Sequence, residues 1–308
     1  MSSLARSLRA PAAPRALPAA TAAGNDPIAG ILCIIGAALF FTACDAAAKF
    51  LTGRIPALEV VWARYAGFAL VTALPMLLRG GLPALGSRSP GLQILRGCCL
   101  IGSTTLFILG LRALPLADAT AMAFASPLFI TALSVPLLGE RVGPRRWGAV
   151  ILGLVGVLIV VQPGTDAFQL AAFLPLASAV CWAVGMILTR RLAGTDSTPT
   201  TLAWTALCGL VATGTMAAFV WVPPSLAEAG WMAFMGLTFA IGHSFVALAY
   251  RRAAASAVAP FSYLQILNST LVGYLVFGAI PDRPTLAGAA IIAGSGLYIA
   301  QRARKRDG

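Results

Sequence analysis

The chain has few charged side chains and almost no histidine. Only 10% of its 308 residues are charged, ten of these are acidic, and His243 is the single histidine. A soluble domain carries about 25% charged residues. Hydrophobic residues make up 59% of the chain, and the mean hydropathy is +0.87. No fold in water could bury so much apolar surface, so the composition excludes a soluble protein and predicts a membrane protein.

The sequence also lacks the motifs of common catalytic and metal sites. It has no phosphate-binding loop, no HExxH and no nucleophile elbow. Its six cysteines lie in or beside apolar segments without metal-ligand or disulfide spacing. An intramembrane enzyme, which we considered as an alternative, needs a convergent nucleophile, base or ligand set that one histidine and one mid-span aspartate do not supply. We therefore expect no catalytic residues, no metal, no cofactor and no enzyme activity.

Ten apolar runs are long enough to cross a bilayer, which takes about 20 residues each. Prolines fall between the runs, where helices can stop. Residues 1–26, rich in Ala, Pro and Arg, are expected to form a disordered cytoplasmic tail, and residues 303–308 a basic cytoplasmic tail. The predicted spans are 28–50, 58–78, 93–112, 117–138, 145–162, 168–190, 199–221, 229–250, 257–278 and 284–301.

The basic residues predict the orientation. With both termini in the cytoplasm, 17 of the 22 Lys and Arg residues fall on the inner side. This arrangement predicts a multi-pass protein of the bacterial inner membrane. The net charge of +12 is thereby explained without nucleic acid, which we do not expect as a partner.

The two halves of the chain align without a gap at an offset of 140 residues. Residues 27–163 and 164–302 are therefore predicted to be two five-span repeats. Because five is odd, the repeats must be inverted in the bilayer, as in many secondary transporters. The predicted fold is an all-α polytopic membrane protein with ten transmembrane helices in two inverted five-helix repeats. The offset pairs, among others, Gly148 with Gly288, Pro144 with Pro284 and Arg112 with Arg252.

Several short motifs stand in a recognisable order. Lys49 ends span 1, Pro56-x-x-Glu59 precedes span 2, and Arg64 lies in span 2. The segment Leu-Gly-Glu-Arg at 138–141 precedes the glycines Gly148, Gly153 and Gly156 of span 5. In this order the chain resembles the drug/metabolite transporter superfamily, as two tandem EamA-type units, with bacterial amino-acid exporters, aromatic ones included, as the nearest resemblance. The resemblance implies a central cavity between spans 1–4 and 6–9, supported by spans 5 and 10.

A few ionisable groups lie within spans, where they are costly. Asp45 and Lys49 are four residues apart, so they can form an ion pair that serves as a gate, or Lys49 can extend to the outer interface with Asp45 neutralising it. Arg64 can hold a substrate carboxylate, or pair with Asp45 or Glu59. His243 either forms a hydrogen bond between helices or lines the pathway.

The remaining candidates line a predicted central cavity. Gln265 and Asn268 share one face of span 9, close to Tyr263, and buried amides need partners. On span 4 we expect a stripe that is either plain packing or part of the site. The predicted substrate-binding residues are Arg64, Trp62, Met122, Phe124, Ser126, His243, Tyr263, Gln265 and Asn268.

The expected function is export of amino acids or similar small amphipathic metabolites by alternating access. A carrier of drugs, purines or sugar derivatives is the first alternative. The expected partners are a small-molecule substrate and the lipid bilayer, and the expected oligomeric state is a monomer or homodimer.

Overall fold

The computed structural model describes residues 26–78, 86–140, 142–164, 169–192, 195–253 and 258–307, and these residues form helices without a strand. The expected disordered tail lies outside them, apart from Asp26. The first half contains α1 (Pro27–Thr52), α2 (Ala57–Leu78), α3 (Pro90–Ala113), α4 (Leu116–Ala123), α5 (Ser126–Leu138) and α6 (Pro144–Val161). The second contains η2 (Leu170–Ala172), α7 (Phe173–Leu192), α8 (Thr198–Ala218), α9 (Leu226–Arg252), η3 (Ala259–Tyr263), α11 (Leu264–Phe277) and α12 (Arg283–Asp307).

The helix ends follow local sequence signals. Pro90 and Pro144 lie in the first turns of α3 and α6, where a missing N–H costs nothing. Ser225 and Glu228 form a capping box that starts α9. Gly139 ends α5 in the left-handed conformation at φ 69°. The expected basic tail, by contrast, continues α12 as helix to Asp307.

Two spans expected to be continuous are interrupted. Span 4 is divided into α4 and α5, which are separated by Phe124 and Ala125. Pro127 explains this break, because its ring clashes with the carbonyl four residues earlier and offers no N–H. Span 9 starts with the tighter helix η3 and becomes α-helical only at Leu264. The interruptions lie at matching positions of the two halves, since residue 124 corresponds to residue 264 at the offset of 140.

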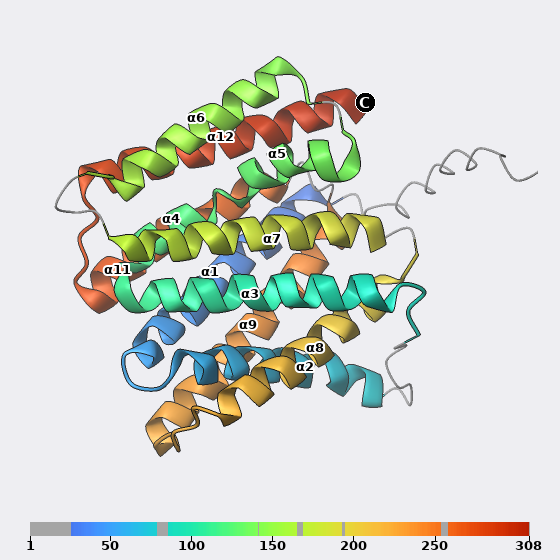
Figure 1. Ribbon diagram of the computed structural model, residues 1–308, viewed down its shortest axis with the longest axis vertical. Helices are drawn as coiled ribbons and strands as arrows, with labels where there is room; N and C mark the ends of the chain where they lie inside the picture. The colour runs from blue at the N-terminus through green and yellow to red at the C-terminus, as the bar shows by residue number, and fades with distance from the viewer. Residues whose placement is uncertain are drawn as a thin grey trace, which may run out of the picture.

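Helices of the first half pack mainly on helices of the second (Figure 1). α1 packs along α9, and α3 packs along α7. α2 packs against α8 and α9, and α3 also contacts α8. α4 contacts α11, while α6 and α12 lie side by side along one edge of the bundle. Exchanging the halves converts the α1–α9 contact into α7–α3 and the α2–α9 contact into α8–α3, and it leaves α2–α8 and α6–α12 unchanged.

Glycines permit close contact between α6 and α12. A Cβ on Gly156 of α6 would lie 2.9 Å from the carbonyl oxygen of Gly288 of α12, and one on Gly288 would lie 2.5 Å from that of Gly156. A Cβ on Gly153 would overlap the side chain of Leu128, and one on Gly296 would overlap the side chain of Tyr263. A Cβ on Gly148 or Gly294 would have no neighbour within 4 Å, so these two glycines do not serve close packing.

The outer surface of the bundle is apolar. Large side chains on it are well exposed, among them Leu32, Leu70, Ile151, Leu158 and Leu275. Seven helical segments in the described part of the chain are long and apolar enough to cross a membrane. An exposed apolar surface of this extent suits lipid as the solvent, and the protein is a multi-pass membrane protein.

Candidate functional site

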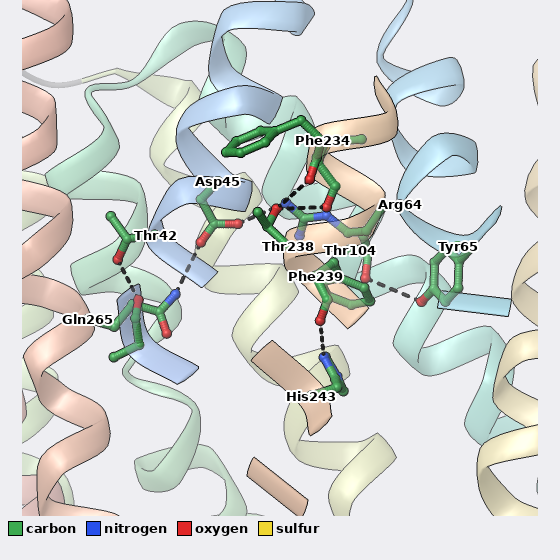
Figure 2. Close-up of polar contacts among 12 residues, drawn as sticks. Thr42, Asp45, Arg64, Tyr65, Thr104, Phe234, Thr238, Phe239, His243 and Gln265 are labelled. Atoms are coloured by element: carbon green, nitrogen blue, oxygen red, sulfur yellow. Dashed lines mark hydrogen bonds and ion pairs between the residues drawn. The ribbon is translucent and has the colours of Figure 1, made fainter. Parts of the chain in front are cut away.

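A buried ion pair joins α1 and α2 inside the bundle. Nη2 of Arg64 donates a hydrogen bond to Oδ1 of Asp45 at 2.8 Å, and the two side chains are 6% and 8% exposed. Nε2 of Gln265, on α11, donates to the other carboxylate oxygen at 3.1 Å. Figure 2 shows these three side chains in a row, Gln265 on one side of Asp45 and Arg64 on the other. The polar group therefore combines side chains from both halves of the chain.

This pairing corrects the predicted ion pair between Asp45 and Lys49. Nζ of Lys49 donates instead to the carbonyl oxygens of Leu111 and Leu114, at 3.0 and 2.7 Å. These carbonyls belong to the end of α3, where the helix dipole favours a positive charge. Although Asp45 and Lys49 lie four residues apart on α1, Asp45 pairs with Arg64 on the neighbouring helix α2.

Aromatic rings lie against the polar group. The guanidinium of Arg64 lies 5.1 Å from the centroid of the Phe239 ring, a cation–π distance. Phe239, Phe41 and Phe68 surround the imidazole of His243, with ring centroids 4.4, 5.0 and 5.2 Å away. We call Phe41, Phe68, Phe239 and His243 the aromatic cage. The sequence did not predict this cage, because the position of a Phe on an all-apolar helix does not indicate which face of the helix points inward.

His243 is held by its own helix. Its Nδ1 lies 3.1 Å from the carbonyl oxygen of Phe239, so Nδ1 carries the proton of this hydrogen bond (Figure 2). In the neutral ring Nε2 is then an acceptor, and it makes no hydrogen bond to another described residue. The interhelix hydrogen bond expected as one role of His243 is absent among the described residues, and its contacts between helices are aromatic.

The two helix interruptions meet through a pair of aromatic rings. Phe124, in the break between α4 and α5, lies with its ring centroid 5.4 Å from that of Tyr263 at the end of η3. Ser126 begins α5 beside this break and is half-buried. Asn268 is half-buried on α11, one turn after Gln265, and hydrogen-bonds to no other described residue.

Two predicted site residues lie elsewhere. Trp62 packs edge-on against Trp221 at 5.5 Å, because two residues before Arg64 on a helix is nearly the opposite face. Met122 is 1% exposed and lines a separate cavity, since the break after α4 interrupts the expected stripe. The structure thus groups Arg64, Asp45 and Gln265 with the aromatic cage, and pairs Phe124 with Tyr263.

The separate cavity has a volume of about 240 Å³ and lies where α4 and α12 begin and α6 ends. Oγ1 of Thr285 donates to Oδ1 of Asp118 at 3.1 Å, and Nε2 of Gln162 donates to Oδ2 of Asp282 at 2.6 Å. Partial burial raises the pKa of the Asp282 carboxyl, but hydrogen bonds from Thr285 and Gln162 outweigh it and hold this pKa below its usual range. The polar lining is Asp118, Gln162, Gln169, Asp282 and Thr285.

The fold and the buried polar group together define a class. Interrupted helices and an internal ion pair in a helical membrane protein are typical of transporters of small molecules. The model of the EamA-like transporter family matches residues 28–162 and 169–300, and the chain belongs to this family.

Its relatives carry different metabolites. The chain is 31% identical to a riboflavin transporter of Rhizobium johnstonii, over 91% of this chain and 93% of the relative. It is 29% identical to an S-adenosylmethionine uptake transporter of Rickettsia bellii, over 86% and 90%. It is 28% identical to a pseudopaline exporter of Pseudomonas aeruginosa, over 85% and 93%. These names support small-metabolite transport but not the narrower expectation of amino-acid export.

One solved structure resembles the fold. It covers 91% of this chain and 99% of its own, with a TM-score of 0.62 and 21% sequence identity. At this identity the likeness extends to the fold alone.

Proposed function

We propose that this protein is a secondary carrier for a small metabolite with a flat, polar ring system. Its binding site would consist of Asp45, Arg64 and Gln265, together with the rings of Phe124, Tyr263 and Phe239. The observation that carries the proposal is the Asp45–Arg64 pair, buried in the bundle and bonded to an amide from the opposite half. A buried ion pair adds little stability by itself, which favours a functional reason for its presence.

The site offers the chemistry that a heterocycle needs. The Nε of Arg64 is buried without a hydrogen-bond partner, so a carbonyl oxygen of a substrate would satisfy it once the movement of alternating access exposes it. Asp45 can accept a ring N–H, and the amide of Gln265 can both donate and accept. Flat rings can stack on the nearby aromatic side chains. Riboflavin and the adenine of S-adenosylmethionine, named in the relatives, have such rings.

The arrangement of the helices supports alternating access. We propose that residues 27–163 and 164–302 are inverted repeats with ten spans in total. The supporting observations are the exchange of contacts between halves and the interruptions at matching positions. Discontinuous helices at the interface between repeats are a common place for a carrier's substrate.

The charge bias supports an orientation with both termini in the cytoplasm and residence in the bacterial inner membrane. The direction of net transport would follow the substrate gradient, since the named relatives include both an uptake transporter and an exporter.

Amino-acid export is the weaker alternative. It would require Arg64 to bind the substrate carboxylate, but the charge of Arg64 is already neutralised by Asp45. A carboxylate would have to displace Asp45 and leave it buried without a partner, which costs several kcal/mol.

The test is transport into proteoliposomes of purified protein, with labelled riboflavin, S-adenosylmethionine and phenylalanine supplied separately. We expect counterflow of at least one of the two ring-containing metabolites, and loss of it in Asp45→Asn. Phenylalanine transport alone would support the alternative. Transport of the heterocycle unchanged in Asp45→Asn would refute the proposed site.

A further inference from the structure

A second buried arginine lies where α3 and α8 begin and α7 ends. Arg96 is on α3, two turns from its start, and only 6% exposed. Nε of Arg96 donates to Oγ1 of Thr189 on α7 at 2.6 Å. Nη1 donates to Oγ1 of Thr205 at 2.5 Å and to the carbonyl oxygen of Thr201 at 3.4 Å, both on α8. All three partners are uncharged.

No carboxylate of a described residue forms an ion pair with Arg96. In the described part of the chain the ion pairs are Arg64–Asp45 and Arg190–Glu140. The titratable side chains with the strongest electrostatic influence on Arg96 are Tyr65 and Cys208, both neutral at pH 7. An isolated charge inside a membrane bundle is expensive, and neutral hydrogen bonds offset only part of that cost. Arg96 therefore differs from Arg64, whose charge is balanced by the carboxylate of Asp45.

Asp196, in the loop before α8, is already engaged. Asp196 accepts from Oγ of Ser87, from the backbone N–H of Arg88 and from Nε2 of Gln93. These bonds fix the carboxylate beside Gln93, at hydrogen-bonding distance from no nitrogen of Arg96. Asp196 is therefore not available to neutralise the charge of Arg96.

The guanidinium has unused donors. Of its five N–H groups, one on Nε and two on Nη1 are accounted for by the threonines. The threonine hydroxyls give their own hydrogens to backbone carbonyls, Thr189 to Gly185 and Thr205 to Thr201. Nη2 of Arg96 hydrogen-bonds to no described residue and, unlike Nε of Arg64, is not sealed from accessible space. Two N–H groups on a fixed, positively charged nitrogen remain available to an acceptor.

The fold does not require an arginine here. Gly236 stands at the corresponding position of the second half, at the offset of 140. A Cβ on Gly236 would lie 3.0 Å from the carbonyl oxygen of Ala63 and 3.0 Å from Cα of Gly67. The equivalent helices there pack backbone against backbone, so the threonine-held Arg96 is a feature added to one half.

We propose that Arg96 is a binding site for an anionic group, a carboxylate or a phosphate, which its Nη2 holds end-on. Thr189 and Thr205 orient the guanidinium, and the start of α8 adds the positive end of a helix dipole. The anion is either part of a transported molecule or a free ion. The proposal stands independently of the central site at Asp45.

The first experiment measures thermal unfolding of the purified full-length protein in phosphate and in chloride at equal ionic strength. We expect millimolar phosphate to raise the midpoint by about 2–4 °C in the wild type. Arg88→Gln, which removes an exposed charge nearby, should keep this shift, and Arg96→Met should lose it. No phosphate-specific shift in the wild type, or an equal shift in Arg96→Met, would overturn the proposal as it concerns a free anion.

The second experiment separates the two sources of the anion. Binding of riboflavin is compared with binding of riboflavin 5′-phosphate, which differs only in the anionic group. If the anion belongs to the transported molecule, Arg96→Met should weaken riboflavin 5′-phosphate binding at least about tenfold and leave riboflavin unchanged. If the site takes a free anion, phosphate shifts the unfolding midpoint but Arg96→Met affects the two flavins equally. Absence of both effects overturns the proposal.

A third measurement needs no variant and covers the case in which Arg96→Met does not fold. Crystals of the wild type soaked in selenate should show an anomalous peak within hydrogen-bond distance of Nη2 of Arg96. A selenate peak elsewhere, with none at Nη2, would contradict the assignment.

Discussion

The two halves share a backbone plan but differ sharply in chemistry at equivalent positions. Four charged residues of the first half, Asp45, Lys49, Arg64 and Arg96, correspond at the offset of 140 to uncharged residues of the second. The counterparts are Gly185, Thr189, Trp204 and Gly236. The first half thus supplies the internal charges, and the neutral counterparts show that the helix packing itself does not need them.

The aromatic cage shows the same asymmetry in another form. The positions equivalent to Phe41, Phe68, Phe239 and His243 hold small residues. These are Cys181, Cys208, Cys99 and Ser103, located where α3 meets α7 and α8. One corner of the bundle is therefore filled by rings beside Arg64, while its counterpart lets the helices pack on small side chains. The binding surface proposed at the first corner has no copy at the second.

The largest effect is expected from breaking the ion pair. Arg64→Leu should lower the free energy of unfolding by about 3–5 kcal/mol, because Asp45 would stay buried without its cation. Adding Asp45→Asn to Arg64→Leu should recover part of this loss. Trp204 and Gly185 are the equivalent uncharged positions of the second half. Adding Gly185→Asn to Trp204→Leu should therefore bring no such recovery. Unfolding in detergent, monitored by fluorescence, provides these values, and additive losses at Asp45 and Arg64 would contradict the coupling.

A smaller loss is expected in the aromatic cage. Phe239→Cys should cost about 2–4 kcal/mol, because it leaves a cavity and removes the ring from Arg64 and His243. The residue that it introduces is the one found at the equivalent position 99. Cys99→Ala serves as the comparison and should cost much less. Equal losses in the two variants, measured by thermal unfolding, would indicate that the halves are more alike than their side chains suggest.

The contact between α6 and α12 joins the two halves at glycines that are not equivalent, since the offset of 140 pairs Gly288 with Gly148 and Gly156 with Gly296. Gly156→Ala and Gly288→Ala each force a methyl group against the backbone of the other helix, and each should cost about 1–3 kcal/mol. Gly148→Ala and Gly294→Ala are the controls, since a Cβ there meets nothing within 4 Å. Unfolding midpoints of Gly156→Ala and Gly288→Ala as high as those of the two controls would argue against this close contact between α6 and α12.

The smallest effect concerns pH. Hydrogen bonds from Ser87, Gln93 and the backbone of Arg88 hold the pKa of the Asp196 carboxyl below its usual range. Their stabilisation is therefore full above about pH 4, the pKa of an unfolded aspartate, and is lost as the pH falls through the lower folded value. The wild type should lose stability in this window more steeply than Asp196→Asn, as unfolding midpoints at successive pH values would show. Parallel curves would contradict the role of these bonds.

The helical membrane architecture followed from hydropathy, because spans in lipid must be long, apolar and helical. The interruptions were missed, although Pro127 lies inside span 4. A proline is tolerated within membrane helices, so its presence alone does not show whether the chain bends or breaks.

The site was harder to predict, because it depends on which faces of different helices meet. Asp45 and Lys49 share a helix face, which favoured their pairing, yet partners from α2 and α3 are better placed for each. Trp62 was grouped with Arg64 because they are close in sequence. Residues two positions apart on a helix, however, point in directions about 200° apart. Gln265 was predicted to be a buried amide in need of a partner; it is half-buried, and only the fold identifies that partner as Asp45.

The central claim is that one binding site uses the charges of the first half and the amide of the second. Its most direct test is the dissociation constant of riboflavin and of S-adenosylmethionine for purified Gln265→Leu, with Gln301→Leu, an exposed position on α12, as the matched control. Losing one neutral hydrogen bond costs about 0.5–1.5 kcal/mol, so Gln265→Leu should weaken binding of the transported metabolite roughly 2- to 13-fold. Gln301→Leu should bind as the wild type does. Unchanged binding in Gln265→Leu, or equal weakening in Gln301→Leu, would contradict the account.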